Sequence, residues 1–119
     1  MNKAAKPPFD IRIHTERMGK DYLFLITGGE AHIGATAMAF YQDGKIHTEL
    51  AVVPGHREDR LALECAGMAC TRLSATVTVV MGIHIEAASR SDIELAVQTV
   101  REEMNRVLDE LLPVVHSQS

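Results

Sequence analysis

The sequence of 119 residues is poor in aromatic side chains, with no Trp, three Phe and two Tyr. A core without large rings must be filled by aliphatic and small side chains, and 46% of the residues are hydrophobic. Small side chains let helices and strands approach one another closely. The length is typical of one domain of about 100–150 residues. We therefore expect a single domain with closely packed elements.

Concentrated positive charge and long apolar runs are also missing. The formal net charge is -4, and acidic and basic residues are interspersed along the chain. Nucleic-acid binding requires a positive surface that neutralises phosphates. No apolar run reaches the roughly 20 residues that cross a bilayer, and the first ten residues lack the apolar segment of a secretory signal. The sequence thus predicts a cytoplasmic protein without nucleic-acid or membrane partners.

Cysteine and recognisable catalytic motifs are scarce. Cys65 and Cys70 lie five positions apart in a predicted helix, where their side chains diverge too much to form a disulfide. We expect them to be buried apolar residues. The histidines have no metal-ligand spacing such as HxxxH, and GxSxG, Walker A and GxGxxG patterns are absent. No metal site and no catalytic residue is predicted, and the sequence favours a binding role over catalysis.

Hydrophobic patterning predicts four strands in the first half of the chain. Residues 9–14 alternate between apolar and polar, as in a strand with one buried face. Residues 22–26 form an uninterrupted apolar run, typical of a central strand covered on both sides. Residues 33–40 place small side chains on one face of a third strand. Asp43-Gly44 predicts a two-residue hairpin that leads into a fourth strand over residues 45–53.

The second half predicts two helices and one strand. A helix beginning within residues 56–59 and running to about Arg72 is apolar on all sides, which indicates burial or an interface. Residues 75–86 are rich in β-branched side chains and predict a strand, with Gly82 as a bulge or a point of close approach. A capping box at residues 91–94 predicts the start of the last helix, and Pro113 predicts its end.

These elements give the order ββββαβα and the α+β class. We expect a four-strand antiparallel meander, then α-β-α, with the helices mainly on one face of a mixed sheet. The domain spans residues 9–113, between a flexible arm over residues 1–8 and a tail over residues 114–119. One layer of helices leaves the small-residue strand face and part of the apolar helix in need of cover, so a homo-oligomer is expected.

The first candidate binding segment joins the second and third predicted strands, from Thr27 to Gly34. Two consecutive glycines permit positive φ and allow backbone N–H groups to face a ligand, while His32 can donate or accept a hydrogen bond. The predicted binding residues here are Gly28, Gly29, His32 and Gly34. The alternative interpretation is a long hairpin loop whose glycines serve geometry alone.

The second candidate segment follows the fourth predicted strand and contributes Gly55, His56 and Arg57. The start of a helix favours an anion, and a guanidinium group can hold a phosphate or carboxylate. Glu58 and Asp59 already supply negative charge at this helix start, so a self-capped helix is the alternative. Both segments follow strands that we expect to be neighbours, so they can share a cleft. His84, on the fifth predicted strand, is expected to be structural.

The two segments and the hairpin between them resemble a known family. The pattern TGGxxHIGA over residues 27–35 and the pattern PGHRED over residues 54–59 are similar to the LpdD-like prenylated flavin chaperone domain, which accompanies UbiD-type decarboxylases. The resemblance spans about Phe9 to Leu112. It implies a non-enzymatic accessory protein that binds prenylated FMN, or FMN, and delivers it to a UbiD-like decarboxylase.

Local chemistry is compatible with that role. The flavin phosphate can use backbone donors at Gly28 and Gly29 or the Arg57 side chain, and His32 and His56 can bond the polar edge of the ring. The scarcity of aromatic residues for ring stacking counts against it. Two alternatives remain: a scaffold protein that acts through an apolar interface without a small ligand, and a small hydrolase or isomerase with His32 or His56 as general base.

Overall fold

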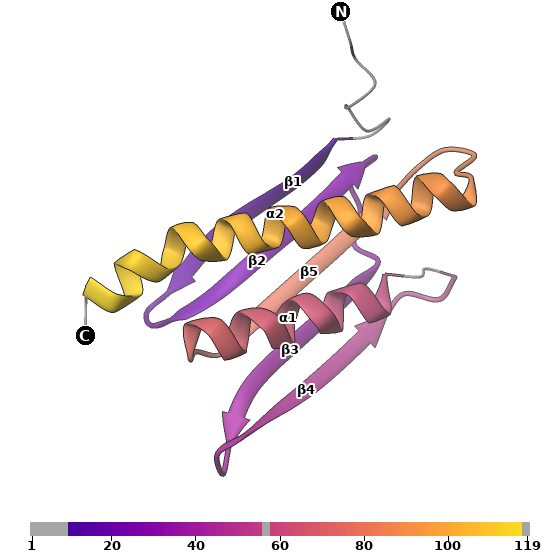
Figure 1. Cartoon of the computed structure of the whole chain (residues 1–119). Coiled ribbons are helices and arrows are strands. Elements are labelled where there is room, and N and C mark those ends of the chain that lie inside the picture. Colours follow the sequence, from indigo (N-terminus) through magenta and orange to yellow (C-terminus); the bar gives the residue numbers. More distant parts are fainter. Residues whose placement is uncertain (1–9, 56–57, 118–119) are drawn as a thin grey trace, which may run out of the picture.

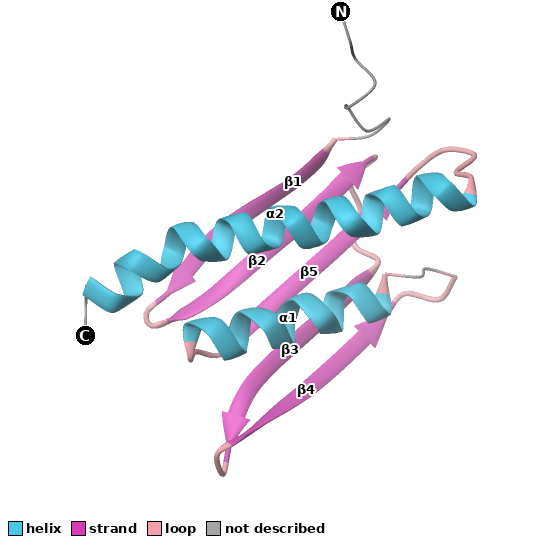
Figure 2. Ribbon diagram, in the orientation of Figure 1, coloured by secondary structure: helices cyan, strands magenta, loops and turns pink. Residues whose placement is uncertain are grey.

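The computed structural model describes residues 10–55 and 58–117, with side chains up to residue 112. Five strands and two helices follow one another in the expected order ββββαβα (Figures 1 and 2). The elements are β1 (Ile11–Met18), β2 (Asp21–Gly29), β3 (Ala35–Gln42), β4 (Lys45–Val52), α1 (Asp59–Leu73), β5 (Val77–His84) and α2 (Arg90–Ser117). The α+β class and the mixed sheet are confirmed.

The sheet has the strand order β1-β2-β5-β3-β4. The four antiparallel strands come as two hairpins, β1–β2 and β3–β4, and β5 lies between them, parallel to β2 and antiparallel to β3. The expectation that β2 and β4 are neighbours is therefore wrong, because β5 and β3 separate them. Asp43 and Gly44 both have positive φ, 56° and 77°, as a type I′ turn requires.

Both helices lie on the same face of the sheet (Figure 1). On that face the alternating residues of β2, β3 and β5 are buried, among them Tyr22, Phe24 and Ile26 of β2. Leu23 and Leu25 point to the other face and are only half-buried. The prediction that β2 is covered on both sides is wrong, because its uninterrupted apolar run packs against helices on one side only.

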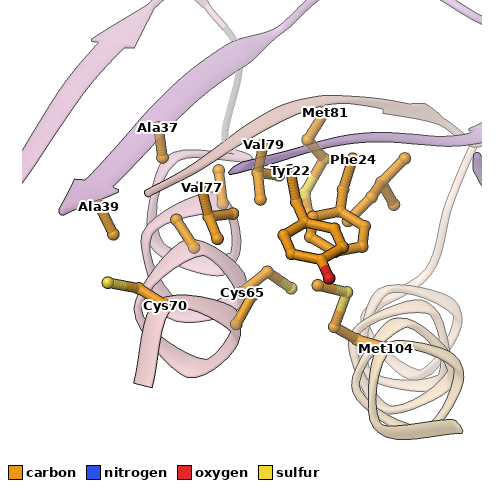
Figure 3. Close-up of a cluster of buried hydrophobic side chains, with 14 of the residues drawn as sticks. Tyr22, Phe24, Ala37, Ala39, Cys65, Cys70, Val77, Val79, Met81 and Met104 are labelled. Atoms are coloured by element: carbon orange, nitrogen blue, oxygen red, sulfur yellow. The ribbon is translucent and has the colours of Figure 1, made fainter. Parts of the chain in front are cut away.

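Small side chains bring α1 close to the sheet. Ala35, Ala37 and Ala39 of β3 are fully buried on the helix face, as their alternation predicted. Ala62, Ala66 and Ala69 of α1 are fully buried as well, which explains why this helix is apolar on most sides. Met104 of α2 reaches the same cluster from the second helix (Figure 3).

Cys65 and Cys70 are free and buried within this core, as predicted (Figure 3). Burial raises the pKa of the Cys65 thiol to about 12; the neighbouring Glu64 carboxylate acts in the same direction, and Arg101 opposes both. The thiol therefore stays neutral at physiological pH and behaves as a small apolar side chain.

The ends of α2 differ from the predicted ones. The N-terminal cap is Ser89, whose hydroxyl accepts the Asp92 N–H at 3.1 Å while the Asp92 carboxylate accepts the Ser89 N–H at 3.0 Å. The helix thus starts before the predicted capping box at residues 91–94. It also continues past Pro113 to Ser117, because a proline near the end removes one helical N–H donor without preventing the last turn. In the described part of the chain, no helix has the length and hydropathy of a membrane span.

Candidate functional site

Residues 30–34 cross the C-terminal end of β5, because β5 lies between the strands that this segment joins. Backbone hydrogen bonds hold the crossing in place: Gly34 N–H donates to Met81 C=O at 2.9 Å, and Val53 N–H donates to Gly34 C=O at 2.8 Å. A Cβ atom at Gly82 would collide with the backbone carbonyl of His32. The predicted close approach at Gly82 is therefore confirmed, and its partner is the crossing segment.

Gly28 and Gly29 form the end of β2 and border the crossing. A Cβ at Gly28 would lie 2.6 Å from Cδ1 of Ile11, and Gly29 has a φ of 68° and no room for a Cβ beside the carbonyl of His84. Both glycines have a clear structural reason in the path of the chain. Neither lines a cavity described below.

Glu58 is the buried acid of this region, with 9% of the residue exposed. It is the N-cap residue of α1, but its side chain does not cap that helix. The carboxylate reaches across to the sheet instead, where Oε2 accepts the Ile83 N–H at 3.0 Å and lies 3.0 Å from Nε2 of His32. Gly34 makes room for it, since a Cβ there would lie 2.6 Å from both carboxylate oxygens.

His32 connects Glu58 to the crossing segment. Its Nε2 faces the carboxylate, and its Nδ1 lies 3.1 Å from the backbone carbonyl of Glu30. Both ring nitrogens face oxygen acceptors, so both can donate only when the ring is cationic. A cationic His32 would balance the charge of Glu58, and the positive end of the α1 dipole would stabilise the same carboxylate. The two candidate segments of the sequence therefore do meet, through Glu58 and His32.

A cavity of about 300 Å³ opens beside Glu58. It lies between the first turns of α1 and α2 and the end of β5, and most of its wall is apolar. Its lining residues are Gly55, Glu58, Leu61, Ile83, His84, Ile85, Ala88, Ile93, Ala96 and Val97. A smaller hollow of about 230 Å³ is lined by Glu30, Ala31, His32 and His84. His84 borders both, and its ring centroid lies 6.5 Å from that of His32.

The structure places the predicted binding residues in different positions. His32 lines the smaller hollow, Gly55 lines the larger cavity, and Gly34 contacts Glu58. His56 and Arg57 lie outside the described residues. The binding roles of all seven predicted residues, Gly28 and Gly29 included, stay predictions.

Sequence reasoning missed Glu58 and the apolar wall supplied by α2. The sequence indicates only a helix-start acid at Glu58, because nothing in its local spacing shows that it meets residues 26 positions before it and 25 positions after it. The only sequence signals were Gly34 and Gly82, whose missing side chains mark the crowded contacts. Ile93 of α2 is 49% exposed and borders the cavity.

The arrangement suits binding more than catalysis. An apolar wall can cover the face of a flat ring, while the Glu58 carboxylate and the His84 ring offer hydrogen bonds at one side. Among the described residues, no three His, Cys, Asp or Glu side chains are grouped so that they could hold a metal ion. An apolar wall with an acceptor at one side suits an organic ring that carries an N–H group on its edge.

Comparison with known protein families agrees with the sequence resemblance. The family model described as the prenylated flavin chaperone LpdD-like domain matches residues 5–112, which covers the whole sheet, all of α1, and α2 up to Leu112. A search of curated proteins finds no match. Because the family model covers most of the chain, the protein belongs to the family of prenylated flavin chaperone LpdD-like domains.

Proposed function

We propose that this chain binds prenylated FMN at the sheet end described above and delivers it to a UbiD-like decarboxylase in the cytoplasm. The observation that carries the proposal is the apolar cavity of about 300 Å³ with the buried Glu58 carboxylate in its wall. The family name supports the accessory role and the flavin. The delivery step and the decarboxylase partner extend beyond that name.

The cavity fits the ring system better than the whole nucleotide. Ligand pockets usually have volumes of about 300–1,000 Å³, and this one is at the lower limit. Leu61 and Ile83 supply apolar contacts for the ring, and Glu58 accepts a hydrogen bond from its N–H edge. The ribityl chain and phosphate then extend out of the cavity, which suits a protein that must release its cofactor.

The N-terminus of α1 is the most suitable place for the phosphate. The Glu58 side chain does not cap this helix, and the positive end of a helix dipole favours an anion. The negative charge of Glu58 opposes a phosphate, but the His32 ring lies 3.0 Å from that carboxylate and offsets the charge whenever it is protonated. Gly55 lines the cavity and has no side chain of its own to fill it.

The test is cofactor retention and transfer. The purified chain is incubated with reduced prenylated FMN without oxygen, desalted, and measured by absorbance and mass spectrometry. We expect retained cofactor and faster activation of an apo-decarboxylase than with free cofactor. If the chain retains no cofactor and does not speed up activation of the apo-decarboxylase, the proposal is contradicted.

A matched pair of variants on α2 links retention to the cavity. Ile93 lines the cavity and is 49% exposed, whereas Leu95 is 40% exposed, two positions further along the helix, and does not line it. Ile93→Asp should reduce cofactor retention at least tenfold, because it places a charge in the apolar wall, and Leu95→Asp should not. Equal retention by both variants would exclude this cavity as the binding site.

The second candidate function is a scaffold protein without a small ligand. The all-round apolar helix no longer favours it, since most apolar residues of α1 are buried in the core. The observation that does favour it is the exposed apolar surface of β4 and the segment after it, at Ile46, Leu50, Val52 and Val53. Retained decarboxylase activation by Ile93→Asp together with His32→Ala would support the scaffold role instead.

A further inference from the structure

One edge of the sheet is open along its whole length. β4 pairs with β3 in an uninterrupted register from Lys45 to Val52, and no described element pairs with its other side. All eight residues of β4 are exposed. Such an edge presents a row of backbone donors and acceptors that can pair with another strand.

β4 contains no proline, bulge or inward-pointing charge of the kind that protects such an edge, and its two charged residues, Lys45 and Glu49, lie on the face away from the helices. The residues on its helix face are all uncharged: Ile46, Thr48, Leu50 and Val52. The three aliphatic ones are 36–38% exposed although they lie next to α1. The opposite edge differs, because Ile11 and Ile13 of β1 pack against the core and α2 contacts this strand.

The hairpin geometry determines which backbone groups of β4 face outward. Gln42 and Lys45 flank a two-residue turn, so this pair exchanges hydrogen bonds and the pattern then alternates along the ladder. The backbone groups of odd-numbered β4 residues therefore point toward β3. The backbone N–H and C=O groups of Ile46, Thr48 and Leu50 point outward, away from β3. The side chains of these same residues lie on the apolar helix face.

We propose that β4 is a dimer interface at which two copies of this chain pair antiparallel, with Thr48 opposite Thr48. In this register Ile46 of each copy lies opposite Leu50 of the other, on the helix face. On the other face, His47 lies opposite Glu49 of the second copy. The histidine ring can donate a hydrogen bond to that carboxylate. The strand is thus complementary to itself on both faces.

The neighbouring registers are less favourable. Centring the pair on Glu49 places two carboxylates opposite each other, and like charges directly opposite are destabilising. Centring it on His47 places Ile46 opposite Thr48, which loses the aliphatic pair. A register shifted by one residue would mismatch the two faces. The dimer has one continuous sheet with five strands from each copy and the α1 helices on the same side.

This interface is independent of cofactor binding, because the cavity lies at the end of the sheet between the helices and β5, and β4 does not line it. The dimer can therefore be present or absent whether or not the proposed function holds. Its formation covers the exposed aliphatic residues of β4 that otherwise remain in water.

The first test is a cross-link at the symmetry axis. Hydrogen-bonded partners in an antiparallel pair have Cα atoms about 5.5 Å apart, within the range of about 4.4–6.8 Å that a disulfide spans. Thr48→Cys should form a disulfide-linked dimer on mild oxidation. Glu16→Cys, on the exposed face of the opposite edge strand, is the control and should stay unlinked. The two native cysteines are buried and should not contribute. Equal cross-linking of both variants would contradict the register.

The second test is the mass in solution at micromolar concentration, by sedimentation equilibrium. Wild type should have twice the chain mass of 13.1 kDa. Leu50→Lys should weaken dimerisation at least tenfold, whereas Leu95→Lys, at a residue of similar exposure (40% against 38%), should not. Circular dichroism confirms that each variant is folded. A monomeric wild type, or a folded Leu50→Lys variant that dimerises as wild type does, would overturn the proposal.

Discussion

At one end of the sheet the chain reverses direction in tight turns, whereas at the other end it crosses from one hairpin to the next over β5. Glycine serves both ends for different reasons. Gly19 and Gly44 in the turns have positive φ, and a Cβ at either would meet nothing within 4 Å. Gly34 and Gly82 at the crossing have no positive φ, but their missing side chains leave room for Glu58 and His32.

The turn glycines supply positive φ and the crossing glycines supply space, and only the second role bears on the candidate site. The turn end needs only backbone conformations, so its glycines are replaceable at a moderate cost. The crossing end needs space, because it brings a buried carboxylate, a histidine and a second chain segment against the end of β5. The same lack of side chains that lets the chain cross also positions Glu58 beside the cavity.

The largest effect is expected for Gly82→Ala, which breaks the crossing. Its Cβ would collide with a backbone carbonyl rather than with a flexible side chain, so the crossing segment has to move. We expect a loss of about 3 kcal/mol in the free energy of unfolding, at the upper end of overpacking costs. Urea unfolding measures it. An unchanged midpoint would show that residues 30–34 do not lie directly on β5.

The next effect concerns the buried carboxylate. Glu58→Leu removes the acceptor of the Ile83 N–H and the partner of His32, so it should destabilise the fold by about 2 kcal/mol. Glu58→Gln keeps an oxygen acceptor of the same shape and should cost about half as much. Thermal unfolding of both variants measures the difference. Equal losses would mean that the volume of the side chain matters and its hydrogen bonds do not.

Gly44→Ala tests the turn end and should have a smaller effect. The residue has a φ of 77° in open space, so alanine meets no atom and only its left-handed conformation is unfavourable. That conformation costs about 1–2 kcal/mol for a residue with a Cβ. Gly44→Asn should cost less, because asparagine tolerates this region. A cost for Gly44→Ala larger than that for Gly82→Ala, in the same urea series, would reverse the comparison between the two ends.

Local patterns predicted most of the fold. The alternation of strand residues, the Asp43-Gly44 turn and the apolar helix each act over a few residues, so a single sequence reveals them. The placement of β5 between the hairpins is a long-range pairing that no local pattern encodes. Two overlapping Ser-x-x-acid patterns, at residues 89–92 and 91–94, each match a capping box, and local spacing does not distinguish them; the first one caps α2.

The candidate site was predicted only in outline, because it too depends on contacts between residues far apart in the sequence. The sequence identified both segments, since glycine and histidine clusters stand out locally. It did not reveal that they meet through Glu58, because that contact depends on residues 30–34 crossing β5. The cavity wall from α2 depends on how that helix packs on the sheet, which periodicity alone does not determine.

Gly67→Ala gives the smallest effect and the opposite sign, which makes it the control for both ends. Gly67 lies in the middle of α1, has no positive φ, and a Cβ there would meet nothing within 4 Å. Glycine is less favourable than alanine within a helix by about 0.8–1.0 kcal/mol, so the variant should be more stable by up to about that amount. The Thr71 hydroxyl bond to the Gly67 carbonyl is unaffected, because it uses the backbone. A destabilised Gly67→Ala variant would mean that this face of α1 is covered by another molecule, and its dependence on protein concentration would show whether that molecule is a second copy.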